Sequence, residues 1–319
     1  MNIEAETLSR AEGCLLGQLA GDALGSLVEF QSPSDIHRRY PNGVRELADG
    51  GTWNTIAGQP TDDSEMALML ARMLVRERRY DAEEARKGYV FWLNSDPFDC
   101  GSTISSGLRG NPNPDRATNG ALMRISPLGI FCCNSDLETT AQLARLDASL
   151  THPHPVCLQA NALYTMAIAQ LISGRKSPRE TYEDIKLWAT DMKVEKTLMT
   201  AILVAADSVP ADYTTLEGWV IIAFHNALWQ LLNAPSLKEG VVDTVMRGGD
   251  TDTNAAIAGA LLGAAYGRNA LPTQWVEKIL SCRPKAGEPR VHRPRPECFW
   301  PVDVLELARS LVAGLCGEA

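Results

Sequence analysis

Residues 62–74 read DDSEMALMLARML, and the apolar side chains of this stretch recur with the period of an α-helix. The positions that share one helix face are Met66, Met69, Leu70, Met73 and Leu74. This spacing predicts an amphipathic helix whose methionines belong to the core. Similar windows cover residues 7–28, 82–94, 119–133, 136–148, 155–173, 177–191, 215–233, 237–247, 250–266 and 303–315. Because the chain contains no pair of alternating β-branched runs joined by a tight turn, we predict an all-α fold.

Two of these windows carry glycine at every fourth residue: Gly13, Gly17, Gly21 and Gly25 in the first, and Gly259, Gly263 and Gly267 in the second. Each glycine inside a helix costs about 0.5–1 kcal/mol relative to alanine, so a compensating contact is needed. Positions four residues apart share one helix face, and the lack of side chains there lets another backbone approach closely. We therefore expect both helices to be central and tightly packed, and they can be each other's partner.

Composition favours a single enzyme-sized domain. The chain has 319 residues, of which 45% are hydrophobic and 22% are charged, so it can bury a sizeable core. We expect one compact multi-helix domain over residues 1–319, with residues 302–319 forming a C-terminal helix. The 30 basic and 39 acidic residues leave a net charge of −9, which argues against general nucleic-acid binding.

The sequence also bears on location. Glu4, Glu6 and Glu12 stand where a secretory signal would carry basic residues. The most apolar run, residues 255–266, is shorter than the roughly 18–20 residues that a membrane-spanning helix needs. The eight cysteines contain no CxxC pair, which fits neither a zinc ribbon nor a disulfide scaffold. We expect a cytoplasmic protein without a membrane span.

Three long segments lack helical periodicity, namely residues 31–60, 94–118 and 283–301. Loops of this length in a compact domain are usually functional, so we predict that they close over the helical core and form a cleft. The third segment contains five prolines and four arginines, which are Arg283, Arg290, Arg293 and Arg295. These arginines could bind phosphate or an acidic protein, but we favour an extended, solvated loop.

Two acidic segments about 190 residues apart carry the strongest chemical signal: TDD at 61–63 and DTDT at 250–253. Each opens a predicted helix, so each alone is explained as an N-cap, and Asp62 and Glu65 have a spacing like that of a capping box. Together they supply four carboxylates, which is more than two caps need. Hard divalent cations such as Mg²⁺ and Mn²⁺ prefer oxygen ligands, and a pair of them needs bridging carboxylates.

The two acidic segments could therefore supply six oxygen ligands to two divalent cations. Gly248 and Gly249 would let the chain turn sharply before the second segment. Zinc is disfavoured because the five histidines show no HxxxH or HExxH spacing and the cysteines are scattered.

Seven blocks of the chain form an ordered set: GCLLGQLAGDALGSLVEF (13–30), TDDSEMALMLAR (61–72), DPFDCGSTISSGL (96–108), NGALMRISPLGIF (119–131), THPHPVC (151–157), GWVIIAFHNALW (218–229) and GGDTDTNAAIAGALLGAAYG (248–267). In this order they resemble the blocks of the ADP-ribosylglycohydrolase family, whose founding bacterial member reactivates ADP-ribosylated dinitrogen reductase. The resemblance covers about residues 10–270. It implies an all-α domain with a dinuclear magnesium or manganese site at the bottom of a cleft that binds ADP-ribose.

The resemblance also implies roles for individual residues. The positions similar to the family's metal ligands are Thr61, Asp62, Asp63, Asp250, Asp252 and Thr253. They coincide with the six oxygens expected from the chemistry. Glu29 and Asp99 are similar to the acids that face the reacting ribose. The residues similar to those of the ADP-ribose groove are Gly101, Ser102, Thr103, Asn119, Gly120, Met123, His152 and His154.

The implied reaction is hydrolysis of the bond between C1 of the distal ribose and a modified side-chain nitrogen. The metal pair would hold the ribose hydroxyls and prepare a water molecule. Asp99 would act as general base or proton shuttle, and Glu29 would orient the ribose or the metal-bound water. The partner is then an ADP-ribosylated protein, and we expect the enzyme to be a monomer.

We predict ADP-ribosyl-arginine as the substrate. Relatives that act on ADP-ribosyl-serine carry a run rich in glycine and serine before their NG-x-x-MR block, where this chain reads PNPDRAT at 112–118. DPFDCGST at 96–103 resembles the arginine-directed bacterial branch more closely. The alternatives are hydrolysis of O-linked ADP-ribose in ADP-ribosyl-serine or O-acetyl-ADP-ribose, a non-catalytic ADP-ribose binder, and a dinuclear phosphoester hydrolase.

Some of these residues also have a purely structural explanation. Glu29 lies two helical turns after Asp22, so the two could form a polar helix flank. His152 and His154 alternate with prolines, which could mark a rigid helix entry as well as a ligand contact. Two tryptophans on an apolar window are expected to pack in the core rather than to stack on adenine, namely Trp219 and Trp229.

Overall fold

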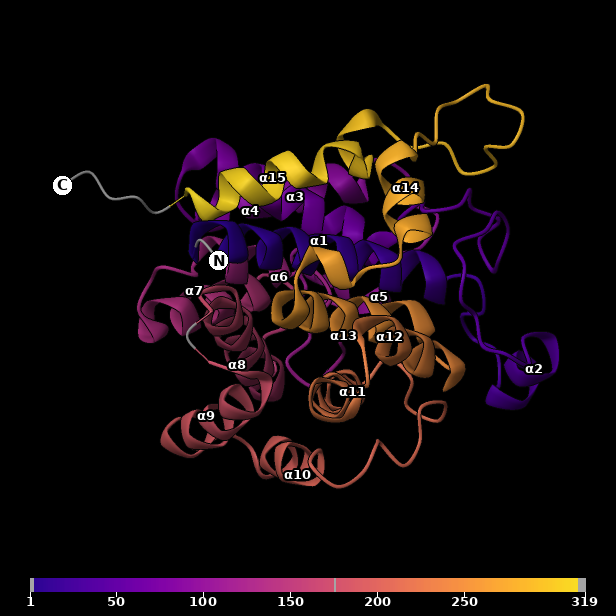
Figure 1. Ribbon diagram of the computed structural model, residues 1–319. Helices are drawn as coiled ribbons and strands as arrows, with labels where there is room; N and C mark the ends of the chain where they lie inside the picture. The colour runs from indigo at the N-terminus through magenta and orange to yellow at the C-terminus, as the bar shows by residue number, and fades with distance from the viewer. Residues whose placement is uncertain (1–2, 175, 315–319) are drawn as a thin grey trace.

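The computed structural model describes residues 3–174 and 176–314, and over these residues it is built from helices (Figure 1). The helices are α1 (Ile3–Gly25), α2 (Pro33–Arg39), α3 (Asp62–Glu77), α4 (Ala82–Leu93), α5 (Ser102–Leu108), α6 (Ser126–Phe131), α7 (Leu137–Ser149), α8 (Pro155–Ile172), α9 (Pro178–Asp191), α10 (Lys196–Val204), α11 (Val220–Asn233), α12 (Leu237–Met246), α13 (Thr251–Tyr266), α14 (Thr273–Ser281) and α15 (Val304–Val312). Two isolated β-bridges are the only strand-like pairings within this described part. The predicted all-α fold is confirmed.

The two glycine ridges pack directly against each other, as predicted. A β-carbon placed on Gly17 would lie 2.1 Å from the carbonyl oxygen of Gly259, and one placed on Gly263 would lie 1.9 Å from that of Gly13. The paired positions run in opposite directions, so α1 and α13 are antiparallel and their backbones touch. The contact continues to Gly25, whose β-carbon would lie 2.4 Å from the Cα of Asp252. The last turn of α1 is therefore held beside the first turn of α13.

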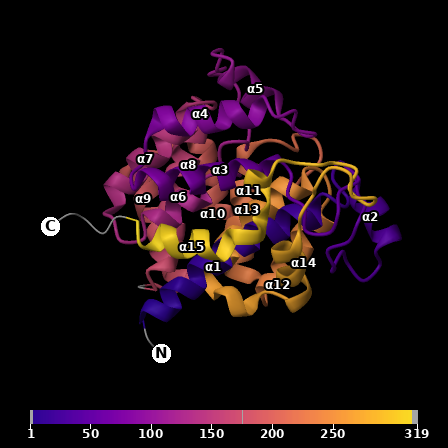
Figure 2. The same cartoon turned by 90° about the horizontal axis from the view of Figure 1, so that it is seen from above.

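The other helices surround this central pair (Figure 1, Figure 2). α3, α6 and α15 pack against α1, while α8, α11 and α12 pack against α13. The methionine stripe of α3 belongs to this core, since Met66 and Met73 are buried and Met69 is partly buried. The apolar side chains form one main core that spans both sides of the α1–α13 pair.

Several helix boundaries differ from the predicted windows. The window 119–133 contains a helix only over α6, because residues 119–125 form successive turns. Residues 215–219 also precede α11 rather than belonging to it. Four short helices were not predicted: α2, α5, α10 and α14. Each has only seven to nine residues, which is too short for a periodic pattern to stand out.

The C-terminal helix is shorter than expected. α15 covers Val304–Val312, and residues 315–319 of the predicted helix lie outside the described residues. One helix, α8, has the length and mean hydropathy of a membrane-spanning helix, at 18 residues and 1.2. It is 78% buried inside the protein, as is usual for a core helix.

Candidate active site and metal centre

The two acidic segments meet at the end of the α1–α13 contact. Asp62 begins α3, and Asp250 is the residue before α13. The carboxyl oxygens of Glu29, Asp250 and Asp252 lie within 4.8 Å of one another. Asp63 lies close enough to Asp250 for their charges to interact. Segments far apart in the sequence thus form one cluster of carboxylates.

A cleft opens above this cluster. The predicted site residues that line it are Glu29, Asp62, Asp99, Gly101, Ser102, Thr103, Asn119, Gly120, Met123, His152, Asp250 and Thr253. Three further predicted ligands, Thr61, Asp63 and Asp252, are buried side chains outside that lining. His154 does not line the cleft: its Nδ1 accepts a hydrogen bond from the N–H of Val156 at 3.2 Å and caps α8.

The capping explanation of the acidic segments does not hold in the structure. The N-terminus of α3 is capped by Asp22 of α1, which accepts hydrogen bonds from the backbone N–H groups of Thr61 and Ser64, each at 3.0 Å. The hydroxyl of Thr61 donates to the same carboxylate at 2.9 Å. Asp250 occupies the N-cap position of α13 but makes no capping hydrogen bond with its side chain. The carboxylates of both segments are therefore available for another role.

Gly248 and Gly249 set the direction from which Asp250 enters the cluster. Both have left-handed backbones, with φ of 76° and 72°, as expected for a sharp turn before α13. A β-carbon on Gly249 would lie 2.1 Å from the carbonyl oxygen of Tyr213, so this position admits no side chain. Asp250 is then fixed by Asn119, whose Nδ2 donates to Oδ2 of Asp250 at 2.7 Å. Asn119 thus supports a proposed ligand as well as lining the cleft.

Two carboxylates of the cluster each have one oxygen without a partner. Oδ2 of Asp63 lies 3.1 Å from the Thr61 hydroxyl, whose single proton is shared between Asp63 and Asp22, and Oδ1 of Asp252 accepts a hydrogen bond from the N–H of Thr253 at 2.9 Å. Oδ1 of Asp63 and Oδ2 of Asp252 are buried and have no hydrogen-bond partner among the described residues. A buried carboxylate oxygen without a partner is costly, and a bound cation would remove that cost. The donor set thus fits hard divalent cations.

The electrostatics of the cluster also favour the binding of a cation. Burial raises the pKa of Asp62, Asp63 and Asp252 well above the usual range, and the neighbouring carboxylates raise these pKa values further. None of these three carboxylates forms an ion pair with Lys, Arg or His within residues 3–174 and 176–314. Acidic groups are therefore gathered here without a basic partner from the described residues, and a bound cation would favour their charged forms.

Glu29 and Asp99 both adjoin this cluster. Burial and the nearby charge of Asp99 raise the pKa of Glu29 to about 8. Burial raises the pKa of Asp99 to about 6, and its carboxyl group lies beside that of Asp62. Glu29 was expected to face the ribose. Its carboxyl oxygen also lies within 4.8 Å of carboxyl oxygens of Asp250 and Asp252, so the three could bind the same cation. Trp53 holds Glu29 there, since its indole Nε1 donates to Oε2 of Glu29 at 2.5 Å.

His152 is both buried and part of the cleft wall. Its Nδ1 lies 2.7 Å from the Thr151 hydroxyl, and its Nε2 lies 2.9 Å from the Thr118 hydroxyl. Burial lowers the pKa of His152 to about 3, so the ring is neutral at physiological pH. Trp219 is less buried than expected, and it lines a neighbouring apolar hollow with Leu216. Trp229 is likewise only partly buried.

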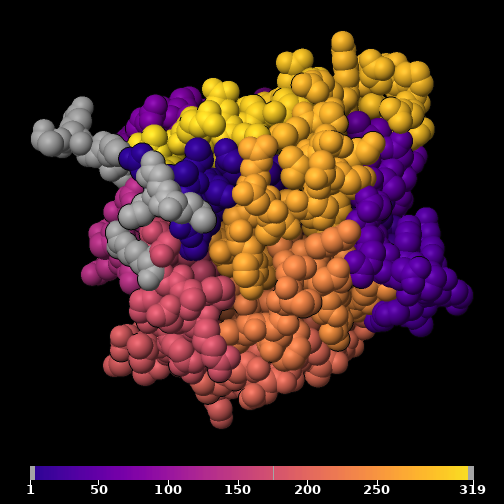
Figure 3. Space-filling view, in the orientation of Figure 1, coloured from indigo at the N-terminus to yellow at the C-terminus, as the bar shows by residue number. Residues whose placement is uncertain are grey.

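The arginine-rich segment 283–301 is not solvated throughout, contrary to our expectation. Arg295 has only 6% of its surface exposed and forms an ion pair with Glu65 at 2.8 Å. Arg293 donates from Nε to the carbonyl oxygen of Trp53 at 2.9 Å. In Figure 3 this part of the chain, drawn in orange, lies directly against the violet surface of residues 31–60. The segment therefore packs against α3 and the loop of residues 31–60.

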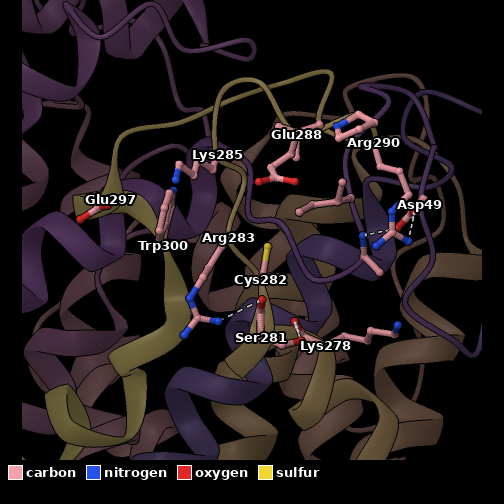
Figure 4. Close-up of a pocket in the computed structure, with 14 residues that line it drawn as sticks. Asp49, Lys278, Ser281, Cys282, Arg283, Lys285, Glu288, Arg290, Glu297 and Trp300 are labelled. Atoms are coloured by element: carbon pink, nitrogen blue, oxygen red, sulfur yellow. Dashed lines mark hydrogen bonds and ion pairs between the residues drawn. The ribbon is translucent and has the colours of Figure 1, made fainter.

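A second hollow of about 450 Å³ lies between this segment and α14 (Figure 4). Acidic and basic side chains mix around it, including Glu288, Lys285 and Arg283. Arg290 pairs with Asp49 at 3.5 Å across one edge. None of the residues that line the carboxylate cleft lines this hollow, so the two are separate.

Comparison with known proteins agrees with the geometry of the cleft. The family model for ADP-ribosylglycohydrolase matches residues 3–311. The chain belongs to the ADP-ribosylglycohydrolase family. The resemblance found over about residues 10–270 is thereby confirmed, and the match extends further, to include the arginine-rich segment.

Members of the ADP-ribosylglycohydrolase family from several organisms are similar over most of their length. The ADP-ribosyl-[dinitrogen reductase] glycohydrolase of Rhodospirillum rubrum is 31% identical over 85% of this chain and 90% of its own. The ADP-ribosylarginine hydrolase Tri1 of Serratia proteamaculans (strain 568) is 28% identical over 87% and 77%. A solved structure described as an ADP-ribosylglycohydrolase-related protein complex has a TM-score of 0.78 at 25% identity, over 97% of this chain and 99% of that one. These likenesses support a hydrolase of ADP-ribose linkages.

Several contributors to the site in this family member were not identified from the sequence, among them Phe30 and Glu217 in the cleft lining and three supporting residues: Asp22, Trp53 and Arg295. Asp22 had appeared only as a possible polar flank of α1, although its place beside the glycine ridge puts it in the interior. Trp53 and Arg295 lie in long loops, where no periodicity shows which side chains turn inward. Trp53 binds Glu29, which is 24 residues away, and Arg295 binds Glu65, which is 230 residues away. The spacing of nearby residues therefore could not predict either contact.

Proposed function

We propose that this protein is a metal-dependent hydrolase that removes ADP-ribose from modified arginine side chains of proteins. The observation that carries the proposal is the buried carboxylate cluster at the cleft, in which one oxygen each of Asp63 and Asp252 lacks a partner among the described residues. A non-catalytic binder of ADP-ribose would have no need for this costly arrangement. Cytoplasmic location and a monomeric state stay predictions.

The residues that would hold two divalent cations, Mg²⁺ or Mn²⁺, are Thr61, Asp62, Asp63, Asp250, Asp252 and Thr253. Glu29 lies near enough to Asp250 and Asp252 to join them. When bound, the cations supply Lewis-acid catalysis and a template for the ribose hydroxyls and a water molecule. Asp22 and Asn119 hold the segments that carry these ligands through hydrogen bonds of 3.0 and 2.7 Å.

Asp99 is the residue we assign to proton movement. It lines the cleft from the loop before α5, and its pKa of about 6 lets its carboxyl group take up and release a proton near neutral pH. In the reaction, Asp99 would accept a proton from the attacking water or return it to the departing nitrogen. Glu29, restrained by Trp53, would orient the distal ribose.

The mouth of the cleft supports arginine as the modified residue. Phe30 lines the cleft and is 56% exposed. Its backbone is left-handed, with a φ of 62°, which a bulky residue rarely adopts. Glu217 lines the same cleft and forms no ion pair among the described residues. Gly249 lies between them: its carbonyl oxygen accepts from the N–H of Phe30 at 2.9 Å, and its β-carbon would be 3.4 Å from that of Glu217.

An aromatic face beside an unpaired carboxylate suits a guanidinium group, which stacks on rings and binds carboxylates through two N–H groups. The O-glycosidic linkage to serine carries no guanidinium group and would use neither feature. Two relatives quoted above are named for ADP-ribosylated dinitrogen reductase and for ADP-ribosylarginine. Together these observations favour the N-glycosidic linkage.

The test is to incubate the protein with ADP-ribosyl-arginine, ADP-ribosyl-serine and O-acetyl-ADP-ribose, with and without a chelator. We expect intact ADP-ribose to be released from the arginine conjugate, and no release once the metal is removed. Release of AMP or phosphate would indicate a phosphoester hydrolase instead. Preferred turnover of the serine or acetyl conjugate would contradict the arginine assignment, and turnover in the presence of chelator would contradict the metal dependence.

A further inference from the structure

Arg295 uses every N–H of its guanidinium group to join two other parts of the chain. Nε and Nη2 donate to the two carboxylate oxygens of Glu65 on α3, each at 2.8 Å. Nη1 donates to the carbonyl oxygens of Ser95 at 2.8 Å and Asp96 at 3.2 Å. Nη2 also donates to the Ser95 hydroxyl at 2.8 Å. All five donors of the planar group are thus satisfied.

The segment that Arg295 holds leads directly to Asp99. Asp96 has a left-handed backbone, with φ of 56°, which is uncommon for any residue other than glycine. Such a conformation persists only where its surroundings enforce it, and here Arg295 binds the carbonyl oxygen of Asp96 itself. Three residues further on, the carboxyl group of Asp99 lies beside that of Asp62. The position of this acid therefore depends on a turn that Arg295 fixes.

Arg295 is itself rigidly placed. Its backbone N–H donates to the carbonyl oxygen of Pro284 at 2.9 Å, and its carbonyl oxygen accepts from Nε1 of Trp300 at 2.8 Å. The guanidinium carbon lies 4.7 Å from the centre of the Phe299 ring. Glu65 is also fixed, because Nε1 of Trp92 donates to it at 2.9 Å. The guanidinium group thus has little freedom to move with the loop.

We infer that Arg295 is a positioning residue for Asp99: it fixes the turn at Ser95 and Asp96 so that the Asp99 carboxyl group stays at the cleft. The inference rests on the proposed function only in assigning a reaction role to Asp99. If Arg295 has this role, residues 283–301 contribute to activity, although they supply no residue to the carboxylate cluster. A misplacement of about 1 Å in a catalytic group can lower the rate about hundredfold.

Arg72 offers a matched control. It joins the same C-terminal segment to the same helix, α3, by donating to the carbonyl oxygen of Cys298 at 2.9 Å and to both oxygens of Asp303 at 2.6 and 2.9 Å. Arg72 makes no hydrogen bond to residues 95–99. Arg72 also donates to the carbonyl oxygen of Trp300 at 3.3 Å. A variant at Arg72 therefore loosens the C-terminal segment around Trp300 but leaves the hydrogen bonds from the Arg295 guanidinium group to Ser95 and Asp96 in place.

Arg295→Lys is the main test variant. Lysine keeps a positive charge beside Glu65 but lacks the planar fork that reaches the two carbonyl oxygens. The double variant Glu65→Gln with Arg295→Gln replaces the buried ion pair with uncharged amides, in case the lysine variant folds poorly. Arg72→Lys is the corresponding control.

The first measurement is hydrogen–deuterium exchange of the metal-free protein. We expect the amides of residues 95–101 to exchange at least about tenfold faster in Arg295→Lys, and at the wild-type rate in Arg72→Lys. This readout depends neither on bound metal nor on turnover. Unchanged exchange over residues 95–101 in Arg295→Lys and in the double variant would overturn the inference.

The second measurement is steady-state turnover of ADP-ribosyl-arginine, with Mn²⁺ binding followed by electron paramagnetic resonance. Arg295→Lys should lower kcat at least about tenfold, with KM and the Mn²⁺ dissociation constant within about twofold of the wild type. Arg72→Lys should leave kcat within about twofold. A kcat loss no larger in Arg295→Lys than in Arg72→Lys would overturn the inference. If the wild type hydrolyses none of the conjugates, the proposed function fails while the exchange measurement still decides the role of Arg295.

Discussion

The carboxylate of Asp22 caps α3 by accepting a hydrogen bond at 3.0 Å from the backbone N–H of Thr61, the N-cap residue, which lies 39 residues further along the chain. Local capping would have used the side chain of Thr61 or Asp62 and removed an oxygen ligand from the cluster. Because α1 supplies the cap from outside, α3 can begin with two carboxylates of the cluster, of which Asp62 lines the cleft and Asp63 is buried beneath it. The central helix pair thus supports the site chemically as well as sterically.

Asp22→Ala should therefore weaken both the fold and the metal site. Loss of a helix cap with several partners should lower the free energy of unfolding by about 1–3 kcal/mol. Urea denaturation measures that change, and Mn²⁺ titration should show weaker binding as α3 frays at Thr61. Asp22→Asn, which keeps an acceptor oxygen, should lose less of both. Equal losses in the two variants would show that the charge of Asp22, and not its capping, is what matters.

Asp252→Asn should have opposite effects on the metal-free and metal-bound protein. Burial and neighbouring carboxylates raise the pKa of Asp252, so above the unfolded-state pKa its charged form destabilises the native state. The uncharged amide should therefore raise the Tm of metal-free protein at pH 7, while lowering Mn²⁺ affinity at least about hundredfold. Calorimetry with and without Mn²⁺ checks both changes. A lower Tm without metal would contradict the picture of uncompensated repulsion.

Metal affinity should rise with pH up to about 8. Without metal, burial and nearby carboxylates raise the pKa of Glu29 to about 8, so this carboxyl group holds a proton at neutral pH that must leave when Glu29 joins the ligands of the cations. Each displaced proton lowers the apparent affinity about tenfold for every pH unit below the pKa. Isothermal titration in buffers of different ionisation enthalpy would measure the release. The same affinity at pH 6 and pH 8 would rule this coupling out.

Gly17→Ala should separate α1 from α13. Its β-carbon would lie 2.1 Å from the carbonyl oxygen of Gly259, a backbone atom that cannot move aside alone. We expect a loss of about 3 kcal/mol or more in the free energy of unfolding, together with weaker Mn²⁺ binding. Gly88→Ala in α4 is the control, since its nearest neighbour would be 3.6 Å away and it should stabilise the fold by about 0.5–1 kcal/mol. Similar stability in both variants would refute the close-contact explanation.

Glu217→Gln should weaken the recognition of the substrate ADP-ribosyl-arginine but not the binding of the product ADP-ribose. If Glu217 binds the guanidinium group, kcat/KM for ADP-ribosyl-arginine should fall about tenfold. Inhibition by free ADP-ribose should stay unchanged, because that product carries no guanidinium group. Steady-state kinetics with competitive inhibition gives both values. Parallel weakening of substrate and ADP-ribose would place Glu217 in the nucleotide groove instead.

The helical fold and the acidic cluster were predictable because they rest on local repeats. The apolar period of α3 and the glycine spacing of α1 and α13 are visible in a few turns of sequence. The convergence of 61–63 with 250–253 followed from the shared chemistry of the two segments. Asp22, by contrast, looks in the sequence like any other acidic residue in a helix. Only the structure shows that its side chain points into the interior, toward the start of α3. Arg295 could not be distinguished from its exposed neighbour Arg290, because both stand in the same proline-rich segment.

The contact of Gly13 with Gly263 also dictates an order of events during synthesis. The ribosome completes the first acidic segment long before the second, so the nascent chain carries half a site and no partner for its glycine ridge. Non-local contacts of this kind close late and slow the folding of a domain. The carboxylate cluster can assemble only after the chain has been translated through α13, so the proposed cation site forms after most of the chain has been made.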